Sequence, residues 1–214
     1  MRALIVYAHP DPASFTAAVR QTVEARRAAA GAEIRLIDLY AVAFDPCLSP
    51  AEFAAYEDTA ENTRPVARHV ADLLWCDTLI FVYPTWWYGM PAILKGWLDR
   101  VMLPGTAFLM PDERNPAIRR GLAHITRLGV FTSGGATRWL TAFIGAPGRR
   151  TILRGVWLLC APGCRRVFAK HYQMDSSTPE SRAEHLARVS RAMDRFLGAP
   201  RLPRLPRLGR EART

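Results

Sequence analysis

The stretch that decides the fold is residues 82–91, which read VYPTWWYGMP. It follows an apolar run over 78–83 and precedes a helix-like run over 92–102. A buried strand, a turn and a helix in succession are typical of parallel sheets, and open α/β sheets bind ligands at the carboxyl ends of their strands. Three consecutive aromatic residues in such a turn favour a flat aromatic ligand. The alternative is an aromatic cap on the core or a subunit contact, since Trp and Tyr are enriched at interfaces.

The rest of the chain alternates between strand-like and helix-like segments. Strands are expected over 3–9, 33–38, 79–83, 124–132 and 164–171, and helices over 15–30, 65–75, 92–102, 138–159 (with breaks) and 179–197. Residues 39–62 are expected to be irregular, and residues 104–121 to form a Pro-rich insertion. This alternation predicts βαβ units and an α/β fold. With right-handed crossovers, the expected architecture is a flavodoxin-like three-layer sandwich whose five-stranded parallel sheet has the order 2-1-3-4-5.

Length and composition limit the class of protein. The 214 residues are 50% hydrophobic, which is enough for one sizeable core, so a single domain over 1–198 and a basic tail over 199–214 are expected. No apolar run is long enough to cross a bilayer, and the N-terminus enters a strand rather than a signal peptide. Four cysteines without a Cys-x-x-Cys pair indicate reduced thiols and a cytoplasmic location. Five scattered histidines give no metal-ligand spacing, so no metal site is predicted.

The chain is strongly basic, with a net charge of +10 and a pI near 10.2. Five arginines recur at every third position over 201–213, and without residues 201–214 the net charge is +6. A disordered tail is one interpretation, and weak contact with an anionic membrane or an acidic partner is the other. The basic body suits phosphate-bearing ligands. Nucleic-acid binding is not expected, because the aromatics cluster in one turn instead of alternating with arginines along a surface.

The expected strand order brings three turns to one edge of the sheet. The first turn holds His9, Ser14, Phe15 and Thr16 at the start of a helix, and the free N–H groups of such an end suit phosphate. The second turn supplies an aromatic wall made of Pro84, Thr85, Trp86, Trp87 and Tyr88. The third turn, Thr132, Ser133, Gly134 and Gly135, supplies backbone amides that no Cβ obstructs at its two glycines.

A phosphate-binding helix end, a flat aromatic surface and backbone amide donors at one edge of the sheet match flavin mononucleotide better than a simple nucleotide. The first turn contains neither a Gly-x-Gly-x-x-Gly fingerprint nor a Walker lysine. No Ser-His-Asp or Cys-His set follows from the spacing, so no catalytic side chain is assigned. A bound cofactor is therefore expected to carry the chemistry.

These motifs resemble the NAD(P)H:quinone reductase family of flavodoxin-like flavoproteins over most of residues 1–185. The most specific segment is PTWWYGMPAILKGW at 84–97, supported by AH at 8–9, SF at 14–15, DLY at 38–40, FDP at 44–46 and TSGG at 132–135. The resemblance implies that the first turn contacts the flavin phosphates, the second lines the isoalloxazine ring and the third holds its pyrimidine edge. It also implies a homodimer whose substrate pocket is shared between subunits.

The implied activity is ping-pong hydride transfer from NAD(P)H through the flavin to a quinone, azo dye or nitroaromatic. FMN is the expected flavin, with FAD as the alternative, because the Arg that follows Thr-Pro in FAD-binding members is spaced a residue differently in Thr178–Arg182. The animal members' Tyr and His after the Gly-Gly pair are absent from 136–147, so backbone amides or Arg138 are expected to handle charge.

Two other classes of function are considered. Some relatives are regulatory flavoproteins on a membrane partner such as a potassium-efflux system, and a basic tail would suit that docking. A one-electron carrier of the flavodoxin kind is disfavoured, because such carriers tend to be acidic and this chain is basic.

Overall fold

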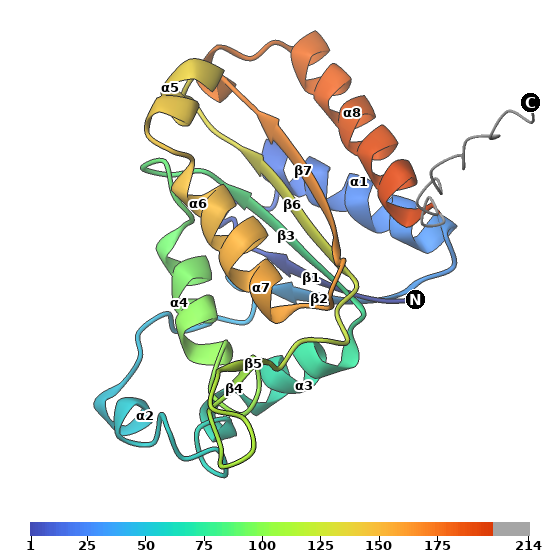
Figure 1. Cartoon of the computed structure of the whole chain (residues 1–214). Coiled ribbons are helices and arrows are strands. Elements are labelled where there is room, and N and C mark those ends of the chain that lie inside the picture. Colours follow the sequence, from blue (N-terminus) through green and yellow to red (C-terminus); the bar gives the residue numbers. More distant parts are fainter. Residues whose placement is uncertain (199–214) are drawn as a thin grey trace, which may run out of the picture.

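The computed structural model describes residues 1–198, and the predicted basic tail at 199–214 lies outside them. A five-stranded sheet runs through the molecule (Figure 1), with the strands β1 (Arg2–Tyr7), β2 (Glu33–Asp38), β3 (Thr78–Pro84), β6 (Arg127–Ser133) and β7 (Arg165–His171). Every pairing is parallel, and the spatial order is β2-β1-β3-β6-β7. In chain order these are the first to fifth strands of the sheet, so the predicted order 2-1-3-4-5 is confirmed.

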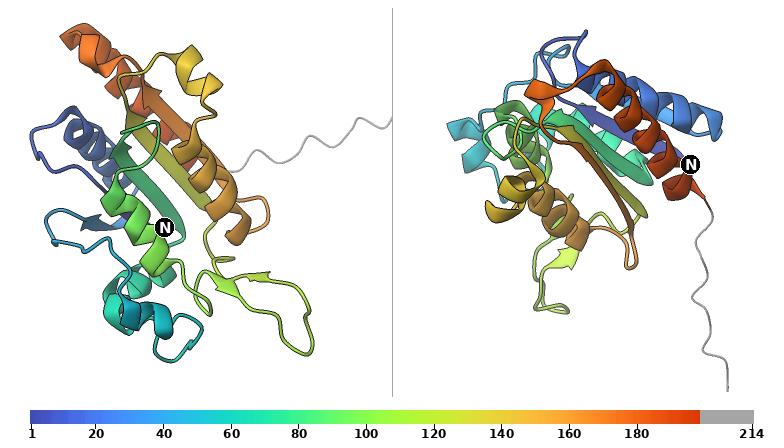
Figure 2. Two further views of the ribbon diagram at one scale, coloured as in Figure 1. Left: turned by 90° about the vertical axis from the view of Figure 1, so that its left-hand side faces the viewer. Right: turned by 90° about the horizontal axis from the view of Figure 1, so that it is seen from above.

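Helices cover both faces of the sheet (Figure 2). One face carries α1 (Phe15–Ala29) and α8 (Pro179–Leu197), while the other carries α3 (Ala67–Trp75), α4 (Ala92–Val101) and a helical run over 147–159. Successive side chains of β3 alternate between the two cores, as strand geometry requires. Leu79 and Phe81 face α3 and α4, whereas Ile80 and Val82 face α1 and α8.

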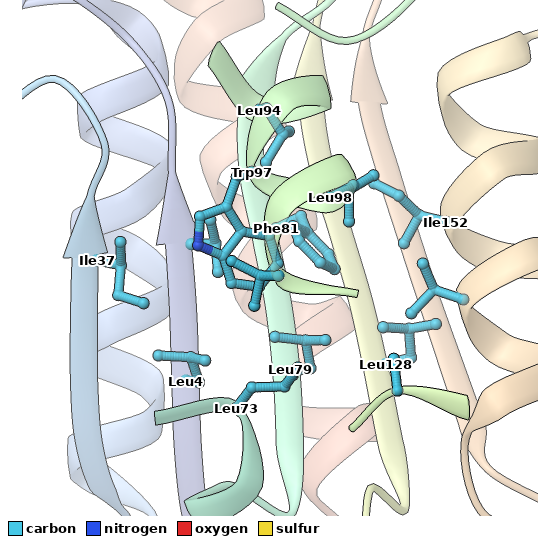
Figure 3. Close-up of a cluster of buried hydrophobic side chains, with 14 of the residues drawn as sticks. Leu4, Ile37, Leu73, Leu79, Phe81, Leu94, Trp97, Leu98, Leu128 and Ile152 are labelled. Carbon is cyan, nitrogen blue, oxygen red and sulfur yellow. The ribbon is translucent and has the colours of Figure 1, made fainter. Parts of the chain in front are cut away.

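The core under α4 is the larger of the two (Figure 3). Trp97 is fully buried there, and its ring stands edge-on to Phe81 at a centroid separation of 5.9 Å. This aromatic pair fixes α4, and with it the turn that precedes α4, against the centre of the sheet.

Local capping explains where the two helices on the first face begin. Ser14 caps α1 by accepting a hydrogen bond from the Ala17 amide. Thr178 and Ser181 form a reciprocal capping box at the start of α8, and Pro179 occupies the first helical position.

The expectation that residues 39–62 are irregular is wrong in part, and the other connecting segments contain short elements of their own. The segment over 39–62 contains α2 (Pro50–Ala54), capped by Ser49 and Glu52, and η1 (Arg64–Val66) precedes α3. The segment over 104–121 contains a small antiparallel pair, β4 (Phe108–Leu109) and β5 (Arg119–Arg120). The prediction of a helical stretch with breaks over 138–159 is confirmed, since this stretch consists of α5 (Arg138–Phe143), α6 (Pro147–Arg150), the π-helical turn η2 (Thr151–Val156) and α7 (Trp157–Leu159). A final short turn, η3 (Met174–Ser176), joins β7 to α8.

Within residues 1–198, none of the helices combines the length and the apolar character that crossing a membrane requires. The same part of the chain contains no cluster of three metal-binding side chains. All four cysteines are free thiols; Cys47 is exposed, and Cys76, Cys160 and Cys164 are buried.

Candidate functional site

The three predicted turns meet at the carboxyl edge of the sheet, the edge at which the strand arrows end (Figure 1). The Thr85 amide donates to the Ser133 carbonyl at 2.6 Å, and the hydroxyls of Thr85 and Thr132 lie 2.9 Å apart. These contacts join the second turn to the third. The Thr16 and Ser133 hydroxyls lie 3.5 Å apart, which joins the first turn to the third.

The first turn presents the amino end of α1. Phe15 and Thr16 occupy the first helical positions, whose N–H groups have no acceptor within the helix. The Phe15 ring packs 5.3 Å from the ring of His171, which anchors this end of the helix on β7. His9 is held by its ring nitrogen Nδ1, which accepts from the Asp11 amide at 3.0 Å. The helix end is thus fixed, with amide donors suited to a phosphate.

The second turn is a tight reversal under backbone strain. Trp86 and Gly89 exchange hydrogen bonds of 3.3 and 2.9 Å between their backbones. The two central residues, Trp87 and Tyr88, have φ angles of +47° and +61°, a left-handed pair that Gly and Asn normally occupy. Such strain persists where the surroundings enforce it, and it is concentrated at functional sites. The Trp87 side chain is 95% exposed, so core packing does not account for this aromatic residue.

The third turn differs from the prediction in one respect. The Gly134 amide donates to the His171 carbonyl at 2.9 Å and is therefore not free for a ligand. The reason is that pairing between β6 and β7 continues past Ser133, which faces His171 in the register. A Cβ on Gly134 would lie 3.3 Å from Lys170 Nζ, and one on Gly135 would overlap the Asp175 carboxylate. The two glycines leave room for these side chains.

A hollow of about 300 Å³ lies between the second and third turns. It is lined by Thr85, Trp87, Tyr88, Gly134, Gly135, Ala136, Leu140, Lys170 and Asp175. A smaller cavity of about 70 Å³ adjoins it and shares Thr85, Tyr88 and Lys170 with it. Of the predicted site residues, Thr132 lines the smaller cavity, whereas Pro84 and Ser133 are buried at the strand ends. Trp86 stands beside His9, with their ring centroids 6.1 Å apart.

Sequence reasoning missed Lys170, which lines both cavities. Its side chain is 95% buried at the end of β7, with Nζ 3.5 Å from the Thr141 hydroxyl and 5.2 Å from the Tyr172 ring centroid. No carboxylate within residues 1–198 forms an ion pair with it. Burial lowers the pKa of this amine by disfavouring its charged form.

A signal for Lys170 existed in the sequence. The chain has only two lysines, Lys95 and Lys170, among its 29 basic residues. Lys170 falls at the end of the fifth expected strand, on the same edge as the three turns. Arg138, which was expected with backbone amides to handle charge, lines the smaller cavity together with Lys170, and its guanidinium lies 5.5 Å from the Tyr172 ring centroid.

The polar groups at this edge suit a flavin. The first-turn amides match a phosphate, and the exposed Trp87 offers a flat surface beside the larger hollow. A positive charge borders the hollow opposite the aromatic turn. Such an arrangement can bind a flat, negatively charged heterocycle and stabilise added negative charge on it.

Comparison with known proteins places the chain in a family. Residues 1–155 match the family described as having the flavodoxin-like fold, and the chain belongs to that family. It is 30% identical over 164 residues to the human "Ribosyldihydronicotinamide dehydrogenase [quinone]", an alignment that covers 69% of this chain and 70% of the human protein. The orangutan (Pongo abelii) protein of the same name is 32% identical over 151 residues, covering 63% of this chain and 64% of that protein. The chain thus spans slightly less than two thirds of the orangutan relative.

A solved structure gives a fuller overlap. The "NAD(P)H:quinone oxidoreductase from Methanothermobacter marburgensis" superposes with a TM-score of 0.74 at 27% identity, covering 90% of this chain and 97% of that one. The Streptococcus mutans protein Smu.1420 superposes with a TM-score of 0.76 at 26% identity, covering 91% of this chain and all of that one. The predicted kinship with NAD(P)H:quinone reductases is confirmed.

Proposed function

We propose that the protein is an NAD(P)H-dependent flavoprotein oxidoreductase that passes electrons from NAD(P)H through a bound flavin to a quinone, azo or nitroaromatic acceptor. The observation that carries the proposal is the hollow of about 300 Å³ between a strained, exposed aromatic turn and the buried Lys170. The names of the relatives, a quinone dehydrogenase and an NAD(P)H:quinone oxidoreductase, support this activity over a regulatory role on a membrane partner.

The bound group in this proposal is FMN. The amino end of α1 with His9, Ser14, Phe15 and Thr16 would hold its phosphate, the segment 84–88 would line its ring, and the segment 132–135 would border its pyrimidine edge. FMN is favoured over FAD because Thr178 caps α8 and Arg182 donates to the Ser177 hydroxyl at 2.8 Å. Both side chains are thus engaged locally, rather than offered to a second nucleotide.

The protein's own contribution is position and charge. When bound, the flavin supplies the hydride chemistry. Lys170 takes the part that sequence reasoning gave to backbone amides or Arg138, because its ammonium borders the hollow and forms no ion pair with a carboxylate within residues 1–198. A positive charge held in a water-poor site stabilises developing negative charge more strongly than one in water. Trp87 and Tyr88 keep one side of the hollow flat and apolar.

An absorption spectrum of the purified protein tests the proposal directly. After addition of FMN and removal of free flavin, flavin bands should remain with the protein, and anaerobic NADPH or NADH should bleach them. Adding a quinone should then restore the bands. A protein that retains neither FMN nor FAD would overturn the proposal.

We further propose a homodimer built on the exposed aromatic residues near the site. Trp139 and Phe143 of α5 are 72% and 76% exposed and stack on one another with centroids 5.4 Å apart. Together with Trp87 they offer an apolar surface of the kind found at subunit contacts. Sedimentation of the parent should give a dimer, and Trp139→Ser with Phe143→Ser should give a monomer; a monomeric parent would refute this. We also propose a cytoplasmic location, which the four free thiols support.

A further inference from the structure

A second hollow, which we call the arginine cavity, lies beside the edge strand β7. It measures about 460 Å³ and is bounded by α6, η2 and β7. Among the described residues 1–198, four arginines line it, Arg149, Arg150, Arg154 and Arg166, and no acidic residue does. It is larger than the hollow of about 300 Å³ at the candidate flavin site.

Two of these arginines are held in place by aromatic rings. The Arg149 guanidinium lies 4.7 Å from the Phe168 ring centroid, and that of Arg166 lies 4.3 Å from the Trp157 ring. Arg166 also donates to the Leu153 carbonyl at 2.9 Å. Stacking engages the face of a guanidinium and leaves N–H groups at its edge for a ligand. The two groups are therefore oriented before any anion arrives.

The arginine cavity carries an excess of positive charge from its lining residues. None of the ion pairs within residues 1–198 includes any of the four arginines. Planar guanidiniums bind phosphate through paired hydrogen bonds, and several of them suit a group of charge −2 better than a single carboxylate. The chemistry of the cavity thus points to a phosphate ester.

The arginine cavity adjoins the smaller cavity at the candidate flavin site. It shares Ala142, Ala146, Arg149 and Phe168 with the smaller cavity of about 70 Å³. That smaller cavity in turn reaches Thr85, Tyr88 and Lys170 at the sheet edge. Phe168 and Lys170 are two positions apart on β7, a rise of about 7 Å. A ligand with one end at the sheet edge and phosphates further along β7 would reach both cavities.

We propose that the arginine cavity binds phosphate groups of the adenosine half of the nicotinamide dinucleotide, and that the protein consequently prefers NADPH to NADH. This rests on the proposed function, which places the nicotinamide at the flavin. NADPH differs from NADH by its 2′-phosphate. A cluster of arginines without ion-pair partners within residues 1–198 should bind this dianion and so favour NADPH over NADH. The competing explanation is that these arginines only protect the edge of β7 against pairing with another chain, a use that needs no ligand.

Calorimetric titration of the full-length protein tests the cavity without depending on turnover. The probes are 2′,5′-ADP and 5′-AMP, which differ by the 2′-phosphate. The parent should bind 2′,5′-ADP more tightly, and Arg150→Gln with Arg154→Gln should weaken that binding at least about tenfold, as expected for loss of charge-assisted hydrogen bonds. Arg191→Gln, an exposed arginine on α8, is the matched control and should bind like the parent.

Steady-state kinetics complete the test. The ratio of kcat/KM for NADPH to that for NADH should exceed one in the parent and fall about tenfold in the double variant. The absorption spectrum of the flavin that the double variant retains should match that of the parent. Equal binding of the two probes by the parent, or a double variant that matches the parent, would overturn the inference and leave the proposed function standing. Absence of flavin binding would overturn the proposed function, while the titration would still report on the cavity.

Discussion

Gly96 of α4 lies so close to Pro46 that a Cβ on the glycine would overlap the carbonyl oxygen and Cα of the proline. This contact joins two motifs that are fifty positions apart in the sequence, FDP at 44–46 and LKGW at 94–97. The same part of the structure holds Trp97 in the core and positions the turn at 84–91 that begins α4. One packing contact therefore accounts for both of these family motifs.

Gly96→Ala should destabilise the protein by about 1–3 kcal/mol, the usual cost of overpacking, because backbone rather than a flexible side chain must move. Gly155→Ala is the matched control. A Cβ on Gly155 meets nothing within 4 Å, and the residue is in a helical turn, so this change should be neutral or slightly stabilising. Urea unfolding followed by circular dichroism measures both, and equal midpoints for the two variants would contradict the packing argument.

Lys170→Met should raise stability while impairing the flavin site. Removing a buried amine that has no carboxylate partner within residues 1–198 should raise the free energy of unfolding by about 1–3 kcal/mol. The reduction potential of the bound flavin should become more negative, because the positive charge that stabilises the reduced form is lost. Lys95→Met, an exposed lysine paired with Asp99, is the control and should alter neither quantity appreciably. An unchanged potential in Lys170→Met would refute the proposed role.

The pH dependence of unfolding tests the same lysine independently. Burial lowers the pKa of Lys170 in the folded protein, so over the range between that pKa and the ordinary lysine value the unfolded chain binds more protons. Stability of the parent should therefore rise with pH through this range and fall as pH decreases through it. Lys170→Met should lack this contribution. Parallel stability curves for parent and variant would show that the amine titrates normally in the fold.

The sequence predicts the sheet well, because β1 and β3 are apolar at nearly every position and such strands belong at the centre of a parallel sheet. Right-handed crossovers limit the order of the strands to a few topologies, of which 2-1-3-4-5 is a common one. The short helix α2 was missed within a segment that Phe44-Asp45-Pro46 made appear irregular, although Ser49 and Glu52 form a recognisable capping box. Capping signals are informative even where hydrophobic periodicity is too short to measure.

The candidate site was predicted less completely, for a physical reason. Turn residues such as Trp87 can be identified as candidate site residues from the sequence, because an aromatic residue in a solvent-facing turn is unusual. The engagement of the Gly134 amide with His171 depends on the register between β6 and β7, which is a tertiary property. The burial of Lys170 likewise depends on Thr141 and Tyr172, which come from separate segments.

Tyr88→Gly should relieve the strain in the second turn. Tyr88 has a φ of +61°, and a residue with a Cβ in this region pays about 1 kcal/mol or more relative to glycine. The variant should therefore unfold at a higher urea concentration than the parent while binding FMN less tightly, since the ring lines both cavities at the sheet edge. Tyr40→Gly, a control at a position without a positive φ, should not gain stability. A loss of stability in Tyr88→Gly would mean that the Tyr88 ring holds the turn in place.

Trp87→Ala and Trp97→Ala should separate flavin binding from folding. Trp97 is fully buried against Phe81, so its removal should cost about 3–5 kcal/mol of stability. Trp87 is 95% exposed, so its removal should leave the unfolding midpoint near that of the parent. FMN affinity, measured by fluorescence quenching and corrected to equal folded fraction, should nevertheless fall more in Trp87→Ala, because the indole forms part of the aromatic wall. If both variants bound FMN like the parent, the exposed indole would belong to the subunit contact instead, and the sedimentation of Trp87→Ala would show it.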